Sequence, residues 1–191
     1  KMHLSVIIPA YNEAKRIADT LFSIKNYLSG QSYDWEVLVV SDGSKDETAE
    51  VINKFASQNK GFRLIDNKKN HGKGYVVKQG MLEAEGDFRL FTDADNATTI
   101  DHLEKFWPHF KQGYDVVIAS IAAKGATLAH SEKFYKRWFG KFGNLWIQFW
   151  LLPGIWDSRR GFKMFTKKAA EDIFPKVRER GWTFDDEALA L

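Results

Sequence analysis

The chain has 191 residues, of which 44% are hydrophobic and 28% charged, and it contains no cysteine. This composition is typical of a globular domain with a sizeable core, and it excludes a disordered tail, a disulfide framework and thiolate metal sites. No stretch approaches the ~18 consecutive apolar residues that would span a bilayer.

The net charge of +3 is unevenly distributed along the chain. Residues 1–123 carry 15 basic and 17 acidic side chains and residues 169–191 carry 3 and 6, whereas residues 124–168 carry 10 and 2. This basic segment also holds four of the seven tryptophans, a combination typical of surfaces that meet anionic lipid headgroups. A helix with an aromatic core face and a solvated basic face explains the composition equally well.

Hydrophobic periodicity predicts alternating strands and helices over the first 120 residues. In chain order, the predicted elements are strand 3–8, helix 13–28, strand 35–40, helix 46–58, strand 62–65, helix 74–85, strand 88–92, helix 99–110 and strand 115–120. Ser44 and Glu47 form a capping-box pattern at the start of helix 46–58, and Pro108 predicts a break or kink in helix 99–110.

This alternation predicts an α/β domain in which helices cover both faces of a mostly parallel sheet. Ligands of such sheets bind beyond the carboxyl ends of the strands. Polar clusters follow three of the predicted strands, at residues 11–13, 42–44 and 93–95. No linker or internal repeat interrupts the chain, so we expect residues 1–191 to form a single domain.

Asp93 and Asp95 are the most specific chemical signal in the sequence. Two carboxylates one residue apart at a strand end can converge on Mg²⁺ or Mn²⁺, which prefer oxygen ligands. Such an ion could bridge a diphosphate and neutralise charge on a departing nucleotide. An isolated Asp-x-Asp is more often a solvated loop, and here the neighbouring polar clusters favour the metal site.

Residues 70–80 (NHGKGYVVKQG) lack both the dinucleotide-binding fingerprint and the P-loop. Lys73 lies between Gly72 and Gly74 at a predicted helix N-terminus, which is a plausible place for a diphosphate contact. A plain turn lysine is the alternative.

Three motifs in this order resemble the family-2 glycosyltransferases, which have the Rossmann-like GT-A fold: residues 6–13 (VIIPAYNE), 39–44 (VVSDGS) and 90–95 (LFTDAD). Further segments are similar to the dolichyl-phosphate (polyprenyl-phosphate) β-glucosyltransferase branch, with the dolichyl-phosphate mannose synthases as near relatives. These segments are 72–74, 80–82, 93–98 (DADNAT), 161–165 (GFKMF) and 182–185 (WTFD). The resemblance runs from about residue 3 to the end of the chain.

The resemblance implies roles for individual residues. The donor nucleotide would contact Pro9, Ala10, Tyr11, Glu13, Asp42, Lys73 and Asp93. Asp93 and Asp95 would hold Mg²⁺ or Mn²⁺ against the diphosphate. Asp95 and Asp185 would take part in catalysis. Asp185 matches an acidic residue that inverting relatives place near the acceptor.

The implied reaction is an inverting transfer of a hexose, glucose in preference, from a UDP-sugar to a polyprenyl or dolichyl phosphate. A phosphate acceptor with a second pKa of about 6 is largely ionised at pH 7, so a general base would contribute little. Asp185 would then position the acceptor or fix a nearby lysine or arginine. Arg159 and Arg160 could bind the acceptor phosphate, although an exposed loop explains them too.

Segment 133–156 suits an interfacial helix pair, which predicts a peripheral protein at the cytoplasmic face of a membrane. Residues 1–120 would form the nucleotide-sugar half and residues 121–191 the acceptor half. The chain stops within a predicted helix, so we expect it to be part of a longer protein.

Two other functions fit the same residues. One is a transferase of the same fold that acts on a glycan or protein hydroxyl with Asp185 as base. The other is a non-catalytic domain that binds a nucleotide sugar and docks on a membrane. Nucleic-acid binding is disfavoured, because no nucleic-acid module is recognisable.

Overall fold

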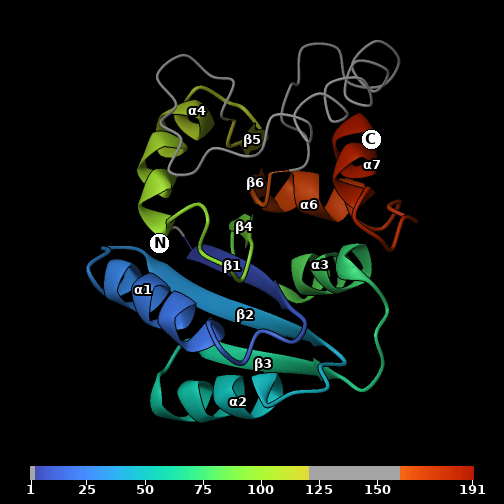
Figure 1. The fold of residues 1–191 in the computed structure, drawn as a ribbon. Helices are drawn as coiled ribbons and strands as arrows, with labels where there is room; N and C mark the ends of the chain where they lie inside the picture. The colour runs from blue at the N-terminus through green and yellow to red at the C-terminus, as the bar shows by residue number, and fades with distance from the viewer. Residues whose placement is uncertain (1–2, 121–159) are drawn as a thin grey trace, which may run out of the picture.

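The computed structural model describes residues 3–120 and 160–191 (Figure 1). Its sheet has six strands in the order β3-β2-β1-β4-β6-β5. The strands are β1 (His3–Ala10), β2 (Asp34–Asp42), β3 (Phe62–Asn67), β4 (Phe88–Thr92), β5 (Val116–Ile118) and β6 (Phe162–Thr166). The helices are α1 (Ile17–Ser29), α2 (Thr48–Gln58), α3 (Lys73–Glu83), the 3₁₀ helix η1 (Ile100–Lys105), α4 (Trp107–Lys111), α6 (Lys167–Ile173) and α7 (Phe184–Ala190).

Strands β3, β2, β1 and β4 are parallel, and they form the predicted sheet. Val6 of β1 aligns with Val37 of β2 and with Leu90 of β4. All three are fully buried. Continuous apolar runs form these strands because both faces of a parallel sheet are covered.

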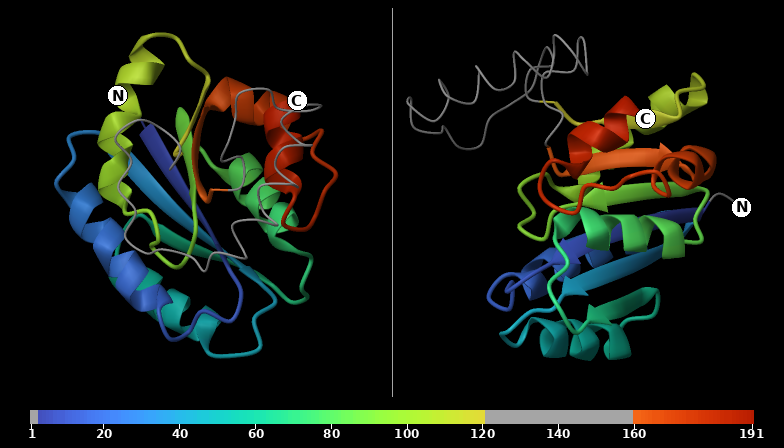
Figure 2. Two further views of the ribbon diagram at one scale, coloured as in Figure 1. Left: turned by 45° about the horizontal axis from the view of Figure 1, so that its top comes forward. Right: turned by 90° about the vertical axis from the view of Figure 1, so that its right-hand side faces the viewer.

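The helices cover both faces of this sheet, as predicted (Figure 2). On one face, α1, α2, η1 and α4 pack over residues such as Val6 and Leu90. On the other, α3, α6 and α7 pack over Ile7 and Phe91. Neighbouring residues of one strand therefore contribute to two separate cores, as the two-residue repeat of a strand requires.

Strand β6 changes the expected sheet. It lies between β4 and β5 and is antiparallel to both, so the strand predicted at 115–120 does not continue the parallel series directly. The register sets Leu90 of β4 opposite Met164 of β6. The sheet is still mostly parallel, and the α/β prediction is confirmed.

Two local predictions had different outcomes. The capping box is wrong: α2 begins at Thr48 after an N-cap Glu47 that makes no side-chain capping bond, and Asp46 accepts the Thr48 N–H instead (3.1 Å). Ser44 does not cap α2 because its hydroxyl accepts the Asn12 N–H. The break near Pro108 is confirmed, since η1 ends at Lys105 and α4 begins at Trp107 with the proline in its first turn.

Within residues 3–120 and 160–191, no helix is both long enough and apolar enough to cross a membrane. The predicted interfacial segment 133–156 and the predicted acceptor residue Arg159 lie outside the described residues.

Candidate functional site

A cavity of about 450 Å³ lies beyond the carboxyl ends of β1, β2 and β4. Every residue predicted to contact the donor or the metal lines it: Pro9, Ala10, Tyr11, Glu13, Asp42, Lys73, Asp93 and Asp95. The remaining described lining consists of Arg16, Asn70, Gly72, Val76, Ala94 and Trp182. Strand ends that are distant in sequence therefore meet at one site, as expected for the carboxyl edge of a parallel sheet.

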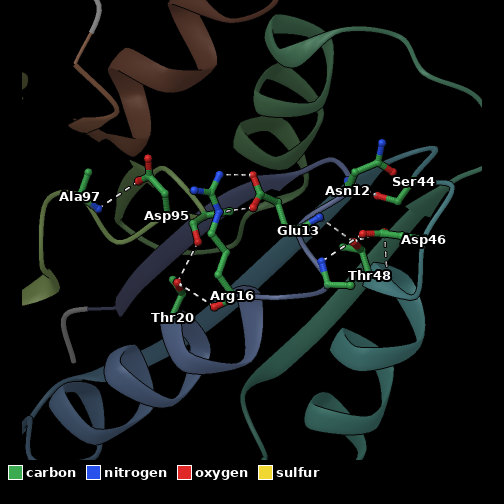
Figure 3. Close-up of polar contacts among 11 residues, drawn as sticks. Asn12, Glu13, Arg16, Thr20, Ser44, Asp46, Thr48, Asp95 and Ala97 are labelled. Atoms are coloured by element: carbon green, nitrogen blue, oxygen red, sulfur yellow. Dashed lines mark hydrogen bonds and ion pairs between the residues drawn. The ribbon is translucent and has the colours of Figure 1, made fainter. Parts of the chain in front are cut away.

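Hydrogen bonds tie the loop after β1 to the loop after β2 and to the start of α2 (Figure 3). The Asn12 N–H donates to Ser44 Oγ (3.1 Å), and the Glu13 N–H donates to Thr48 Oγ1 (2.8 Å). Asn12 has a φ of 55°, a left-handed conformation that asparagine tolerates better than most residues. These bonds fix the backbone on both sides of Asn12, and so they place Tyr11 and Glu13 in the cavity wall.

Arg16 is a cavity cation that the sequence reasoning missed. Its guanidinium donates to both carboxylate oxygens of Glu13, with Nη2 to Oε1 at 2.7 Å (Figure 3). One turn further along α1, Thr20 Oγ1 donates to the Ala94 carbonyl (2.8 Å), which joins this helix to the Asp93–Asp95 segment. The three-residue spacing of Glu13 and Arg16 was the available signal, because such pairs face each other at the start of a helix.

Asp42 is 4% exposed and holds the loop that leads into α3. Its Oδ1 accepts the His71 N–H (2.7 Å) and its Oδ2 accepts the Gly72 N–H (2.9 Å). Each carboxylate oxygen can accept a second hydrogen bond, so these contacts leave capacity for a ligand donor. The contact of Asp42 with the donor nucleotide stays a prediction.

The start of α3 explains the glycines on either side of Lys73. Gly72 has a φ of +96°, and a Cβ there would lie 2.3 Å from the Arg180 carbonyl oxygen. The Gly74 N–H donates to that same carbonyl (2.8 Å). This close packing directs Lys73 to Asp93, with Nζ 2.6 Å from Oδ1 and 4.7 Å from the centroid of the Trp182 ring.

Asp93 and Asp95 follow β4 on a turn in which Asn96 has a φ of 54°. The Asp93 N–H donates to the Gly161 carbonyl (3.1 Å), and its carboxylate packs so closely on Gly161 that a Cβ there would lie 1.8 Å from Oδ2. Asp95 is exposed, and its Oδ1 accepts the Ala97 N–H (3.0 Å).

In the described part of the chain, no three His, Asp or Glu side chains are grouped closely enough to enclose a metal alone. Mg²⁺ in nucleotide-dependent enzymes is usually held by one or two carboxylates together with phosphate oxygens and water. Asp93 and Asp95 are two carboxylates on one cavity wall, and such a donor set fits Mg²⁺ or Mn²⁺ when a diphosphate supplies further oxygens.

Asp185 does not lie among the described residues that line the cavity. It is buried on α7, where its Oδ1 accepts a hydrogen bond from Nζ of Lys163 (2.6 Å), a buried lysine on β6. Burial raises the pKa of Asp185 and lowers that of Lys163, although the attraction between them opposes both shifts. Lys163 also donates to the Arg160 carbonyl. The structure thus joins Asp185 to a lysine, and the roles of Asp185 in positioning the acceptor or as a base stay predictions.

The family and its fold are identified by comparison with known proteins. The sequence profile of Glycosyl transferase family 2 matches residues 5–174. The chain is 35% identical to Dolichyl-phosphate beta-glucosyltransferase ALG5C of Trichomonas vaginalis, with 100% of this chain and 60% of that protein covered. It is 32% identical to the human Dolichyl-phosphate beta-glucosyltransferase, with 98% and 62% covered. The chain thus spans about three fifths of the length of these relatives.

Among solved structures, glucosyl-3-phosphoglycerate synthase of Mycobacterium tuberculosis in complex with Mn²⁺, UDP-glucose and phosphoglyceric acid is similar, with a TM-score of 0.71 at 17% identity. The match covers 98% of this chain and 64% of that one. It confirms the GT-A fold expected from the resemblance.

Proposed function

This chain belongs to glycosyl transferase family 2, and from that premise we propose that it moves a hexose from a nucleotide-diphosphate sugar to a polyprenyl or dolichyl phosphate. UDP-glucose is the favoured donor, and the transfer inverts the anomeric carbon. The names of the relatives at 32–35% identity support this choice of sugar and acceptor. The protein would act at the cytoplasmic face of a membrane and contact it through residues 133–156.

The observation that carries the proposal is the meeting of Asp42, Lys73, Asp93 and Asp95 in one cavity. Two carboxylates suited to a divalent ion and a lysine beside them form a site for a diphosphate. The cavity volume of about 450 Å³ lies in the range of small-molecule sites.

In the proposed reaction, an oxygen of the acceptor phosphate forms a bond to the anomeric carbon of the sugar. The bond from that carbon to the diphosphate breaks on the opposite face, and its electron pair leaves with UDP. Mg²⁺ or Mn²⁺, when bound, would neutralise charge on the departing diphosphate. Asp93 and Asp95 would hold this ion, and Lys73 would exchange Asp93 for a phosphate oxygen.

The chain has no need of a general base for such an acceptor. A phosphate monoester is largely ionised at pH 7, so its oxygen attacks without losing a proton first. The burial of Asp185 and its bond to Lys163 support this, because a carboxylate that is 2% exposed and paired with a lysine is poorly placed to take a proton. Arg160 and Arg159 would bind the acceptor phosphate through their guanidiniums.

The test is transfer of radiolabel from UDP-glucose or GDP-mannose to a short polyprenyl phosphate in the presence of Mn²⁺ or Mg²⁺. Label from UDP-glucose should enter the organic phase, and EDTA should abolish the transfer. If label enters the organic phase only from GDP-mannose, the transferred sugar is mannose and not glucose. If UDP binds in a metal-dependent way but no lipid product forms, the proposed donor site stands and the proposed lipid-phosphate acceptor is wrong.

A further inference from the structure

The ion pair between Lys163 and Asp185 has no direct part in the proposed reaction. Lys163 is 1% exposed and Asp185 is 2% exposed, and neither is among the described residues that line the cavity. A buried ion pair is a weak source of stability, because the loss of hydration offsets most of the attraction. The position of Lys163 in the fold indicates a different use.

Lys163 makes a second contact that leads towards the cavity. Its Nζ donates to the carbonyl of Arg160. That carbonyl belongs to the planar peptide unit that joins Arg160 to Gly161, so fixing the carbonyl also fixes the start of Gly161. The lysine therefore holds the turn that enters β6.

Gly161 in turn contacts Asp93 at two points. Its carbonyl accepts the Asp93 N–H (3.1 Å), and its Cα faces the Asp93 carboxylate with no room for a Cβ. A shift of this turn would therefore move both the backbone and the carboxylate of Asp93.

The ring of Phe91 connects the same residues from the side of β4. Nζ of Lys73 lies 5.3 Å from the ring centroid and Nζ of Lys163 lies 5.6 Å from it. Both lysine cations therefore lie near the ring of Phe91, and the hydrogen bond to Asp185 holds Lys163. Lys73 is left as the partner of Asp93.

We propose that Lys163 is a positioning residue that holds the carboxylate of Asp93 for the metal and diphosphate, acting through the turn at Arg160 and Gly161. Asp185 keeps the lysine in place. This inference rests on the proposed function, because it assigns the pair to the donor site.

The first experiment measures UDP binding to the full chain by calorimetry, with Mn²⁺ and with EDTA. The variants are Lys163→Met and the double variant Lys163→Met/Asp185→Leu, which leaves no buried charge unpaired. Loss of a group that orients a metal ligand typically costs 10- to 100-fold in metal affinity, so both variants should lose roughly tenfold or more of the Mn²⁺-dependent gain in UDP affinity. Their affinity in EDTA should not change.

The double variant separates positioning from a structural role. If the pair only avoids an unpaired buried charge, the double variant should recover both stability and Mn²⁺-dependent affinity. Recovery of both would overturn the proposal. Arg89→Met is the matched control, because Arg89 is an equally buried cation on β4 that pairs with Glu171 (2.9 Å) and does not line the cavity. It should keep the wild-type effect of Mn²⁺.

A second measurement needs no ligand. Amide hydrogen exchange of Asp93, measured by NMR, should become at least tenfold faster in the double variant and stay unchanged in Arg89→Met, when each is compared at equal global stability. Unchanged exchange in the double variant would overturn the positioning role. If wild-type protein binds no UDP with Mn²⁺, the proposed function fails, and the exchange rate still decides whether Lys163 positions Asp93.

Discussion

Two lysine–aspartate pairs in this molecule have the same separation and very different surroundings. The pair at the cavity, Lys73 and Asp93, has an N–O distance of 2.6 Å with side chains 13% and 33% exposed. The pair between β6 and α7, Lys163 and Asp185, has the same distance with side chains 2% and 3% exposed. Distance therefore does not distinguish the two pairs, whereas access to water does.

Access to water determines which pair a ligand can open. At the cavity, a diphosphate could take the place of Asp93 as the partner of Lys73, and a metal could take the place of Lys73 as the partner of Asp93. Both exchanges are open because both side chains are within reach of solvent. Beneath it, separation of Lys163 from Asp185 would leave two charges in an apolar interior, at a cost of several kcal/mol. The first pair is thus suited to exchange with a ligand, and the second to keeping a fixed geometry.

The largest effect should come from removing one member of the buried pair. Lys163→Met should lower the free energy of unfolding by roughly 3–5 kcal/mol, because Asp185 would stay buried without a cation. Burial raises the pKa of Asp185 above its ordinary value of 3.8 although Lys163 lowers it, so removal of the lysine should raise this pKa further in the folded variant. The loss should therefore be full at neutral pH and shrink as the pH falls through the raised pKa. Urea unfolding at several pH values measures the loss of stability and its pH dependence. An equal loss at pH 4 and pH 7 would contradict the view that the unpaired charge of Asp185 causes it.

Opening the cavity pair should affect transfer more than folding. Asp93→Asn should lower the transfer rate by roughly a hundredfold or more, because it removes a carboxylate from the proposed metal site. A titration of Mn²⁺ with the radiolabel assay would show whether excess metal restores part of the rate. The matched control is Asp66→Asn, since Asp66 also lies 2.6 Å from a lysine, Lys68, but does not line the cavity. A control as inactive as Asp93→Asn would exclude a specific role.

Removal of Asp46, a carboxylate whose partners are mainly backbone groups, should have an intermediate effect on stability. Desolvation raises the pKa of Asp46, but hydrogen bonds from Thr48 and from the Ala14 N–H outweigh it and leave the pKa below 3.8. Asp46→Ala should lower the free energy of unfolding by about 1 kcal/mol, because the Asp46 carboxylate accepts the N–H of Thr48, the first residue of α2. The contribution is present above pH 3.8 and lost as the pH falls through the folded-state pKa, so wild type and variant should converge in acid. Thermal unfolding as a function of pH tests this.

The smallest effect should come from Lys68→Met. Lys68 also lies 2.6 Å from its carboxylate, Asp66, but its side chain is 86% exposed. Water and salt screen such a pair, so the unfolding midpoint should equal that of wild type within error at 0.15 M salt. A clear destabilisation here would show that distance, and not exposure, controls these pairs.

The parts of the site built from strand ends could be predicted from the sequence. Each polar cluster directly follows an apolar run, and parallel topology brings such strand ends to one edge whatever the details of packing. Asp42 and Asp93 therefore reach one cavity although 51 positions separate them in sequence.

The contacts of the second half could not be predicted in this way. Residues 162–166 form a short apolar run interrupted by Lys163, and nothing local shows that this run enters the sheet beside β4. Burial of the lysine depends on Asp185, 22 positions further on. The Ser44 and Glu47 pattern misled for a similar reason, because a distant residue, Asn12, competes for the serine hydroxyl.

The place of β6 in the sheet also bears on how the chain is assembled during synthesis. β4 ends at Thr92, but its neighbour on the side away from β1 begins at Phe162. On a ribosome that makes the chain from its N-terminus, β1 to β4 emerge first, and the free backbone edge of β4 has to wait for β6. Unpaired edges recruit other strands, and contacts so far apart in sequence form slowly. The open edge of β4 is therefore a second place, besides the outer edge of β3, at which a nascent or shortened chain would be prone to aggregate.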